Sequence, residues 1–66
     1  MAKTVVERNS TKIIARLKRE GWAEAGTRGS HVKLQNAAGE HIVVPHPKKD
    51  LPIGTARQIA KAAGWL

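Results

Sequence analysis

The spacing of apolar residues is helical in the first readable part of the chain. Three apolar residues fall on one stripe of a helix: Ile13, Ile14 and Leu17. Ser10 precedes this stripe and can accept a hydrogen bond from a first-turn amide, as a helix N-cap does. Gly21 follows it, and glycine adopts the left-handed conformation that ends a helix at little steric cost. The pattern therefore predicts a helix over about residues 11–20.

Further along the chain, apolar and polar residues alternate as they do in β-strands. Within residues 30–36, Val32 and Leu34 point to one face of the predicted strand. If that face is the core, His31 and Lys33 lie side by side on the opposite, open face. The alternation therefore predicts that one histidine and one lysine are presented together to solvent.

The remaining segments predict two more strands. We expect a short strand over residues 22–26 and a third strand over residues 40–44. In the third strand, Ile42 and Val44 should face the core, and Pro45 should end the strand because proline cannot donate to the ladder.

Turns and a second helix complete the predicted elements. Two glycine-containing turns are expected at Gly26–Gly29 and at Asn36–Gly39. Trp22 is expected in the core, where the first helix meets the sheet. A second helix is predicted over about residues 55–63, and Gly64 should end it.

The order helix, three antiparallel strands, helix predicts an α+β fold of the double-stranded-RNA-binding-domain type. A three-stranded sheet with one apolar face needs both helices on that face. Residues 1–66 should form a single domain. Residues 1–8 carry no clear pattern, and we expect an N-terminal extension there that is either mobile or laid against the domain edge.

The charge of the chain points to a polyanionic partner. Twelve Lys and Arg stand against five Asp and Glu, which gives a formal net charge of +7. Such a field attracts nucleic acid or an acidic protein. We expect no membrane association, because no apolar run approaches the roughly 20 residues that span a bilayer. The lack of cysteine excludes a disulfide framework, a thiolate zinc site and a cysteine nucleophile, and it fits a cytoplasmic protein.

His31 is the strongest candidate for chemistry. Histidine titrates near neutral pH, so it can take or give a proton. RNA carries its own nucleophile, the 2′-hydroxyl, and a general base can remove that proton so that the oxygen attacks the adjacent phosphate, while nearby cations stabilise the developing charge. The same pattern also fits an ordinary solvated strand histidine, and the Lys48–Lys49 pair before the second helix fits either a phosphate contact or a charged loop.

The three histidines do not predict a metal site or a cofactor. His31, His41 and His46 lack the helical i, i+4 spacing of a zinc motif, and few acids lie near them. Ser30 and His31 are adjacent on a strand and point to opposite faces, which argues against a Ser–His dyad. His46 lies between two prolines, where it either braces the loop by a hydrogen bond or touches RNA.

Several short motifs, in order, resemble the HicA toxin family, the messenger-RNA-cleaving partner in HicA–HicB toxin–antitoxin systems. The resemblance runs from about residue 9 to residue 66. It rests on these segments: Asn9-Ser10, Gly21-Trp22, Arg28-Gly29-Ser30-His31, Val44-Pro45-His46-Pro47, Lys49-Asp50-Leu51-Pro52-Ile53-Gly54-Thr55 and Ala63-Gly64. The resemblance implies a double-stranded-RNA-binding-like fold and an endoribonuclease that cleaves messenger RNA without needing the ribosome.

The resemblance also implies roles for residues and partners. His31 matches the first histidine of the family's Gly-Ser-His-His motif, which implies that it is the catalytic residue of a metal-independent acid–base mechanism. On this hypothesis, phosphates are held by four cations: Arg28, Lys33, Lys48 and Lys49. Support would come from three further residues: Gly29, Ser30 and His46. A HicB-type antitoxin would cover the basic face of a toxin that is itself monomeric.

The chain departs from the family motif at Val32, which stands where the second histidine is expected. Alternation places residue 32 on the buried face, where valine is at home, so we expect catalysis to be spared. Two other functions stay open: a non-catalytic RNA-binding module of the same fold, and a domain whose basic face serves only an acidic protein partner.

Overall fold

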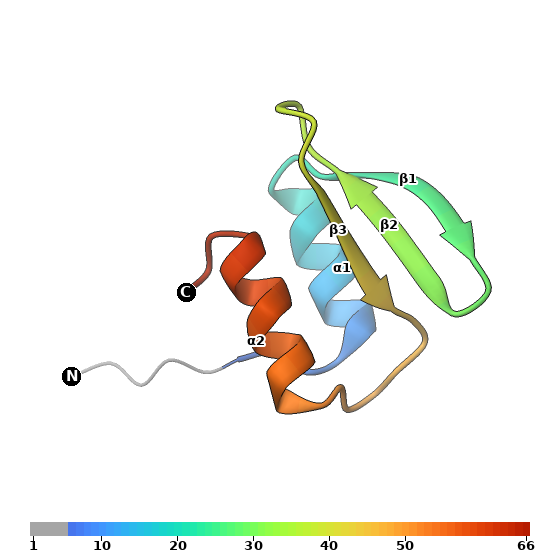
Figure 1. Ribbon diagram of the computed structural model, residues 1–66, viewed down its shortest axis with the longest axis vertical. Helices are drawn as coiled ribbons and strands as arrows, with labels where there is room; N and C mark the ends of the chain where they lie inside the picture. Colours follow the sequence, from blue (N-terminus) through green and yellow to red (C-terminus); the bar gives the residue numbers. More distant parts are fainter. Residues whose placement is uncertain (1–5) are drawn as a thin grey trace.

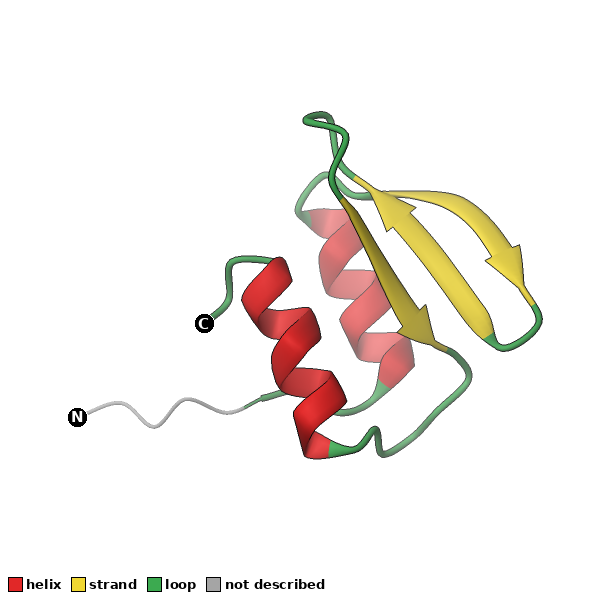
Figure 2. Ribbon diagram, viewed as in Figure 1, coloured by secondary structure: helices red, strands yellow, loops and turns green. Residues whose placement is uncertain are grey.

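The computed structural model describes residues 6–66 and has the predicted order of elements (Figure 1). The elements are α1 (Ser10–Arg19), β1 (Ala23–Arg28), β2 (His31–Gln35), β3 (His41–Pro45) and α2 (Ile53–Ala62). The three strands form one antiparallel sheet in the order β1-β2-β3. Both helices lie on the same side of the sheet (Figure 2). The α+β architecture predicted from the sequence is confirmed, and it is consistent with a double-stranded-RNA-binding-like fold.

The core lies between the helices and the inner face of β2 and β3. The inward residues of the two strands are all buried: Val32, Leu34, Ile42 and Val44. They pack in one cluster with the stripe of α1 and with Leu51, Ala56 and Ile59. Trp22 belongs to this cluster, as predicted. Because alternate residues point to opposite faces, the buried set leaves His31, Lys33 and Gln35 exposed.

The start of α1 differs from the prediction, because the N-cap is Asn9 and not Ser10. The Asn9 side chain accepts hydrogen bonds from the amides of Thr11 at 3.0 Å and Lys12 at 3.3 Å. Ser10 is instead the first residue of the helix and is fully buried. Both residue types cap helices well, so the local pattern could not decide between them. The Ser10 hydroxyl is engaged by the loop that follows β3.

The turn predicted at Gly26–Gly29 is also wrong in its position. Gly26 and Thr27 belong to the ladder of β1, where they pair with Lys33 and Val32. The first glycine accommodates a register shift next to Ala25, and only the second, Gly29, makes the turn, with a φ of 56°. As a result, β1 runs to Arg28 and a two-residue connection leads directly into β2.

The other boundaries are close to expectation. The turn at Asn36–Gly39 is present and is closed by the Asn36 side chain, whose oxygen accepts from the amides of Ala38 and Glu40. Helix α2 begins at Ile53, earlier than predicted, directly after Pro52. Proline readily precedes a helix because it lacks the amide that would otherwise need a partner there.

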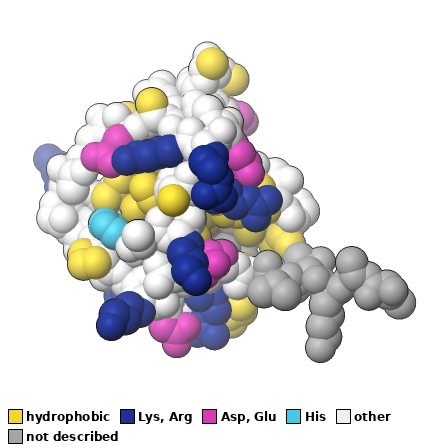
Figure 3. Space-filling model, turned by 180° about the vertical axis from the view of Figure 1, so that it is seen from behind, with side chains coloured by type: hydrophobic (Ala, Val, Ile, Leu, Met, Phe, Trp, Pro, Cys, Tyr) yellow, Lys and Arg dark blue, Asp and Glu magenta, His cyan; other side chains and the backbone are white. Residues whose placement is uncertain are grey.

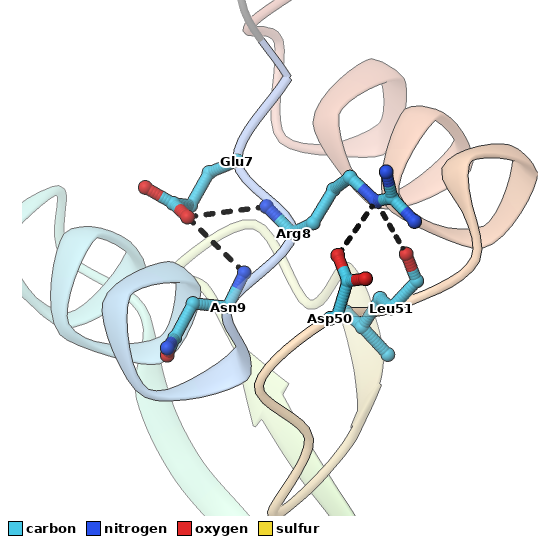
Figure 4. Close-up of polar contacts among 5 residues, drawn as sticks. All are labelled: Glu7, Arg8, Asn9, Asp50 and Leu51. Atoms are coloured by element: carbon cyan, nitrogen blue, oxygen red, sulfur yellow. Dashed lines mark hydrogen bonds and ion pairs between the residues drawn. The ribbon is translucent and has the colours of Figure 1, made fainter.

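The segment before α1 is fixed against the segment before α2 (Figure 4). Arg8 Nε donates to the Leu51 carbonyl at 2.7 Å and lies 3.2 Å from Asp50 Oδ1. The Leu51 amide donates back to the Arg8 carbonyl at 2.8 Å. Val6 packs partly buried against the core. Residues 1–5 of the expected N-terminal extension lie outside the described residues.

The loop after β3 is held to α1 by one buried hydroxyl. Ser10 Oγ accepts a hydrogen bond from the Lys48 amide at 2.8 Å and lies 2.7 Å from His46 Nδ1, with which it shares a second hydrogen bond. The Ser10 amide in turn donates to the Lys48 carbonyl at 2.9 Å. Three polar contacts therefore join the first turn of α1 to residues 46–48.

The C-terminal residues return to α1 through Trp65. Its indole Nε1 donates to Glu20 Oε1 at 2.7 Å, and Arg16 lies over the ring, 4.1 Å from the centroid. Arg16 Nε also donates to Glu20 Oε2 at 2.9 Å. The hydrogen bond from Trp65, followed by that from Arg16, lowers the pKa of the Glu20 carboxyl below its ordinary value of 4.5.

We predict that Ser10→Ala destabilises the fold by about 1–3 kcal/mol, because the Lys48 amide and His46 Nδ1 lose a buried partner. Urea unfolding followed by circular dichroism measures the change. Thr11→Ala is the matched control, since the Thr11 side chain is exposed and only its amide is used by the cap. Equal stability of the two variants would contradict this account of Ser10.

We predict that Glu20→Gln reduces the pH dependence of stability in acid. A carboxyl whose pKa is lower in the folded state stabilises the fold above its unfolded-state pKa, and this contribution is lost as the pH falls through the folded-state value. The native chain should therefore exceed the variant in melting temperature at pH 7, and the difference should shrink below about pH 4.5. Glu40→Gln controls for the loss of one negative charge. A gap that stays constant with pH would be inconsistent with the prediction.

Candidate functional site

The open face of the sheet is built from rows of directly paired residues. One row contains Arg28, His31 and Pro45, and the next row on the same face contains Gly26, Lys33 and Val43. Every second residue of a strand shares a face, so these six side-chain positions lie on the side away from the helices. The sheet therefore brings residues from all three strands to one surface.

His31 is the first residue of β2 and is exposed. The Gly29–Ser30 connection places it opposite Arg28, its partner in the ladder. Val32 and Leu34 are buried, and they fix which face of β2 points to the core. The imidazole of His31 must therefore project to the open face. Within residues 6–66, its ring makes no hydrogen bond or ion pair. The imidazole is thus available to a ligand.

A hollow of about 300 Å³ lies beside His31 on the open face. It is lined by Gly26, Thr27, Arg28, His31, Lys33 and Val43. Three residues predicted for the site from the sequence are therefore brought together: Arg28, His31 and Lys33. The other three were missed. Gly26 and Thr27 were assigned to a turn. Val43 was not singled out, because a single exposed valine gives no sequence signal of a binding surface.

The predicted residues Lys48 and Lys49 line a different hollow, of about 550 Å³. Its other lining residues are Asn9, Thr11, Lys12 and Pro47. The two hollows share no lining residue. Lys12 is the addition that sequence reasoning missed, because the contact between the first turn of α1 and the 46–48 loop brings it beside Lys48.

The residues expected to support the site connect the two hollows. The Ser30 carbonyl, one residue before His31, accepts a hydrogen bond from the His46 amide at 2.7 Å. The His46 side chain meets Ser10, so the bracing hydrogen bond that was one of its two expected roles is present. Gly29 supplies the positive φ of the turn before His31. The segment from Pro45 onward therefore runs from the row that contains His31 to the hollow lined by Lys48 and Lys49.

Charge pairing separates the basic residues into two groups. Figure 3 shows Lys and Arg side chains over one view of the surface, several of them beside acidic side chains. Ion pairs occupy Arg8 with Asp50, Arg16 with Glu20, and Lys18 with Glu24. Across the described part of the chain, no ion pair involves the cations of the two hollows, which are Arg28, Lys33, Lys12, Lys48 and Lys49. Arg19, Arg57 and Lys61 also form no ion pair there, so the two hollows together hold five of the eight cations without one among residues 6–66.

The histidines do not converge. No group of three or more His, Asp or Glu side chains that could hold a metal ion occurs among residues 6–66. His31 projects from the open face, whereas His46 contacts the buried Ser10 of α1. The two helices within residues 6–66 are ten residues each, well short of a membrane-spanning segment.

Comparison with known protein families identifies the family of the chain. The family model described as the HicA toxin of bacterial toxin–antitoxin systems matches residues 10–65. This span contains both helices, all three strands and both hollows except Asn9. No curated protein matches the chain.

Proposed function

The chain belongs to the HicA toxin family, whose members are toxins of bacterial toxin–antitoxin pairs, and on this premise we propose that it is an endoribonuclease that cleaves messenger RNA with His31 as its acid–base residue. The observation that carries the proposal is an exposed imidazole that lines one hollow together with Arg28 and Lys33, two cations that form no ion pair within residues 6–66.

The proposed reaction needs one group that transfers protons, and positively charged side chains that bind the phosphate. His31 takes the proton of a ribose 2′-hydroxyl, and the freed oxygen forms a bond to the adjacent phosphorus. The bond from phosphorus to the 5′-oxygen of the next nucleotide breaks, and that oxygen receives a proton from the imidazolium. The products are a 2′,3′-cyclic phosphate and a free 5′-hydroxyl. No metal ion enters any of these steps.

Arg28 and Lys33 stabilise the charge that develops on the phosphoryl oxygens. Positioned cations act most strongly where charge grows in the transition state. Both residues line the hollow with His31, and neither is neutralised by an acidic side chain in the described structure. Lys48 and Lys49 line the second hollow, so they hold the RNA away from the reacting phosphate rather than at it.

Val32 in place of the family's second histidine fits this mechanism. Its side chain is only 5 % exposed and packs in the core beneath the helices. A residue on that face cannot reach an RNA bound on the open face. The proposed chemistry therefore depends on position 31 and not on position 32.

The proposed partner is a HicB-type antitoxin in the cytoplasm. An acidic or hydrogen-bonding surface that covered the His31 hollow would block RNA, and the net charge of +7 would speed its encounter with the toxin. We propose that the toxin is monomeric alone and inactive in the larger complex. A non-catalytic RNA-binding module of the same fold is the alternative that the following experiment separates.

We predict that His31→Ala lowers the cleavage rate of a single-stranded transcript by at least about 10²-fold, since one acid–base group contributes roughly 10²–10⁴. A gel assay with purified protein measures the loss, and circular dichroism verifies the fold. His41→Ala is the matched control, because His41 is exposed on the same sheet face but lies outside the hollow. Cleavage by the native chain should persist in EDTA and leave cyclic-phosphate ends.

Three results would contradict the catalytic proposal. Full activity of the His31→Ala variant would remove the residue assignment. A strict requirement for a divalent cation would remove the metal-independent mechanism. Binding of RNA by the native chain without any cleavage would favour the non-catalytic module.

We predict that Lys33→Ala weakens RNA binding while Lys18→Ala does not. Lys33 is unpaired beside His31, whereas Lys18 Nζ lies 3.2 Å from Glu24 Oε1. Affinity for an uncleavable 2′-deoxy single strand should be measured over a series of salt concentrations. Each lost phosphate contact should reduce the slope of log affinity against log salt by about 0.7. Equal slopes for the native chain and Lys33→Ala would count against a phosphate contact at this residue.

A further inference from the structure

We propose that the hollow beside His31 is a nucleobase subsite, which holds the base of the nucleotide that supplies the attacking 2′-hydroxyl. This inference rests on the proposed ribonuclease function and adds the part of the substrate that the hollow takes. It assigns roles to Gly26 and Val43, which take no part in the proton and phosphate chemistry.

The hollow has an apolar element where a strand surface is normally polar. Val43 is 50 % exposed, which makes it one of three large exposed hydrophobic residues in the described chain. Its ladder partner is Lys33, and the partner of Lys33 on the other side is Gly26. At Gly26 a side chain is missing, and a Cβ built there would meet nothing within 4 Å. The row therefore combines an exposed apolar side chain with empty space.

The connectivity of a nucleotide places its base here. The 2′-hydroxyl and the base are attached to neighbouring carbons of the same ribose, C2′ and C1′. If His31 removes the 2′-proton and Arg28 and Lys33 hold the phosphate, the base must lie within one sugar ring of the imidazole. The surface within that distance is the hollow that these three residues line together with Val43 and Gly26.

The lining determines how the base would be held. None of the six residues is acidic, so the lining offers no carboxylate acceptor to a base. Base edges are read by matched donors and acceptors, and in the proposed complex the donors of Arg28 and Lys33 are directed at the phosphate. The flat face of a base can instead lie on the Val43 methyl groups and against the plane of the Arg28 guanidinium. The subsite should therefore select bases by size and contact, which gives a graded and not a strict preference.

Binding can be tested without catalysis. The native chain is titrated with an uncleavable 2′-deoxy oligonucleotide and with an abasic oligomer of equal length and charge, while methyl signals are followed by NMR. The Val43 methyl signals should shift with the base-containing strand and stay in place with the abasic one. The Ile53 methyl signals serve as the internal control, because Ile53 is equally exposed, at 51 %, but lies at the start of α2. Equal Val43 shifts with both oligomers would overturn the proposal.

Filling the hollow tests its part in cleavage. Gly26→Leu should place a side chain in the empty space without displacing backbone, since Gly26 has no positive φ and no close neighbour. We expect kcat/KM on single-stranded RNA to fall roughly 10- to 100-fold, the range that a base contact is worth, and the preferred cleavage positions to change. Gly54→Leu is the matched control, because Gly54 is exposed, has equal space around it and lies outside both hollows.

The outcomes distinguish failure of the nucleobase subsite from failure of the proposed ribonuclease function. If the native chain cleaves RNA and Gly26→Leu, shown to be folded by circular dichroism, cleaves the same positions at the same rate, the subsite is wrong and the ribonuclease stands. Loss of antitoxin binding by that variant with unchanged cleavage would likewise overturn the subsite and assign the hollow to a protein side chain. If the native chain binds the base-containing strand at Val43 but cleaves nothing, base binding in the hollow stands, whereas the ribonuclease and the role of that nucleotide in attack are wrong.

Discussion

The burial of one face of β2 and β3 is the constraint on which the rest of the structure depends. Val32, Leu34, Ile42 and Val44 must be covered by the helices, and a strand that turns these residues inward turns their neighbours outward. A slip of one residue would bury His31 and Lys33 and expose the core. The exposure of the imidazole is therefore secured by the hydrophobic effect acting on its neighbours, and not by any contact of its own.

A second constraint is the buried Ser10 hydroxyl. Its hydrogen bonds to the Lys48 amide and His46 join the beginning of α1 to the loop after β3. The backbone of that loop is also bonded to the residue before His31, through the His46 amide and the Ser30 carbonyl. These hydrogen bonds therefore fix the loop to both the helix and the sheet. They determine where Lys48 and Lys49 lie relative to Lys12.

Local patterns predicted most of the fold and half of the site. Strand faces are a property of neighbouring residues, so the outward position of His31 and Lys33 and the burial of Val32 could be predicted directly. The N-cap could not, because Ser10 takes its partners from residues 36 and 38 positions away. The division of the basic residues between two hollows was equally hidden, since it depends on how the loop after β3 folds back onto α1. Gly26 misled the prediction because a glycine at a bulge and a glycine in a turn look alike in sequence.

The two hollows differ in the sequence separation of the residues that line them. Arg28 and His31 are joined by a two-residue connection, whereas all three strands of the sheet lie between Lys12 and Lys48 in the sequence. Closing a long loop costs entropy before any contact rewards it, so distant pairs assemble late. We therefore expect the β1–β2 hairpin that presents the imidazole to form before the hollow lined by Lys12, Lys48 and Lys49. A half-folded chain would then expose the His31 imidazole before Lys12 and Lys48 line a common surface.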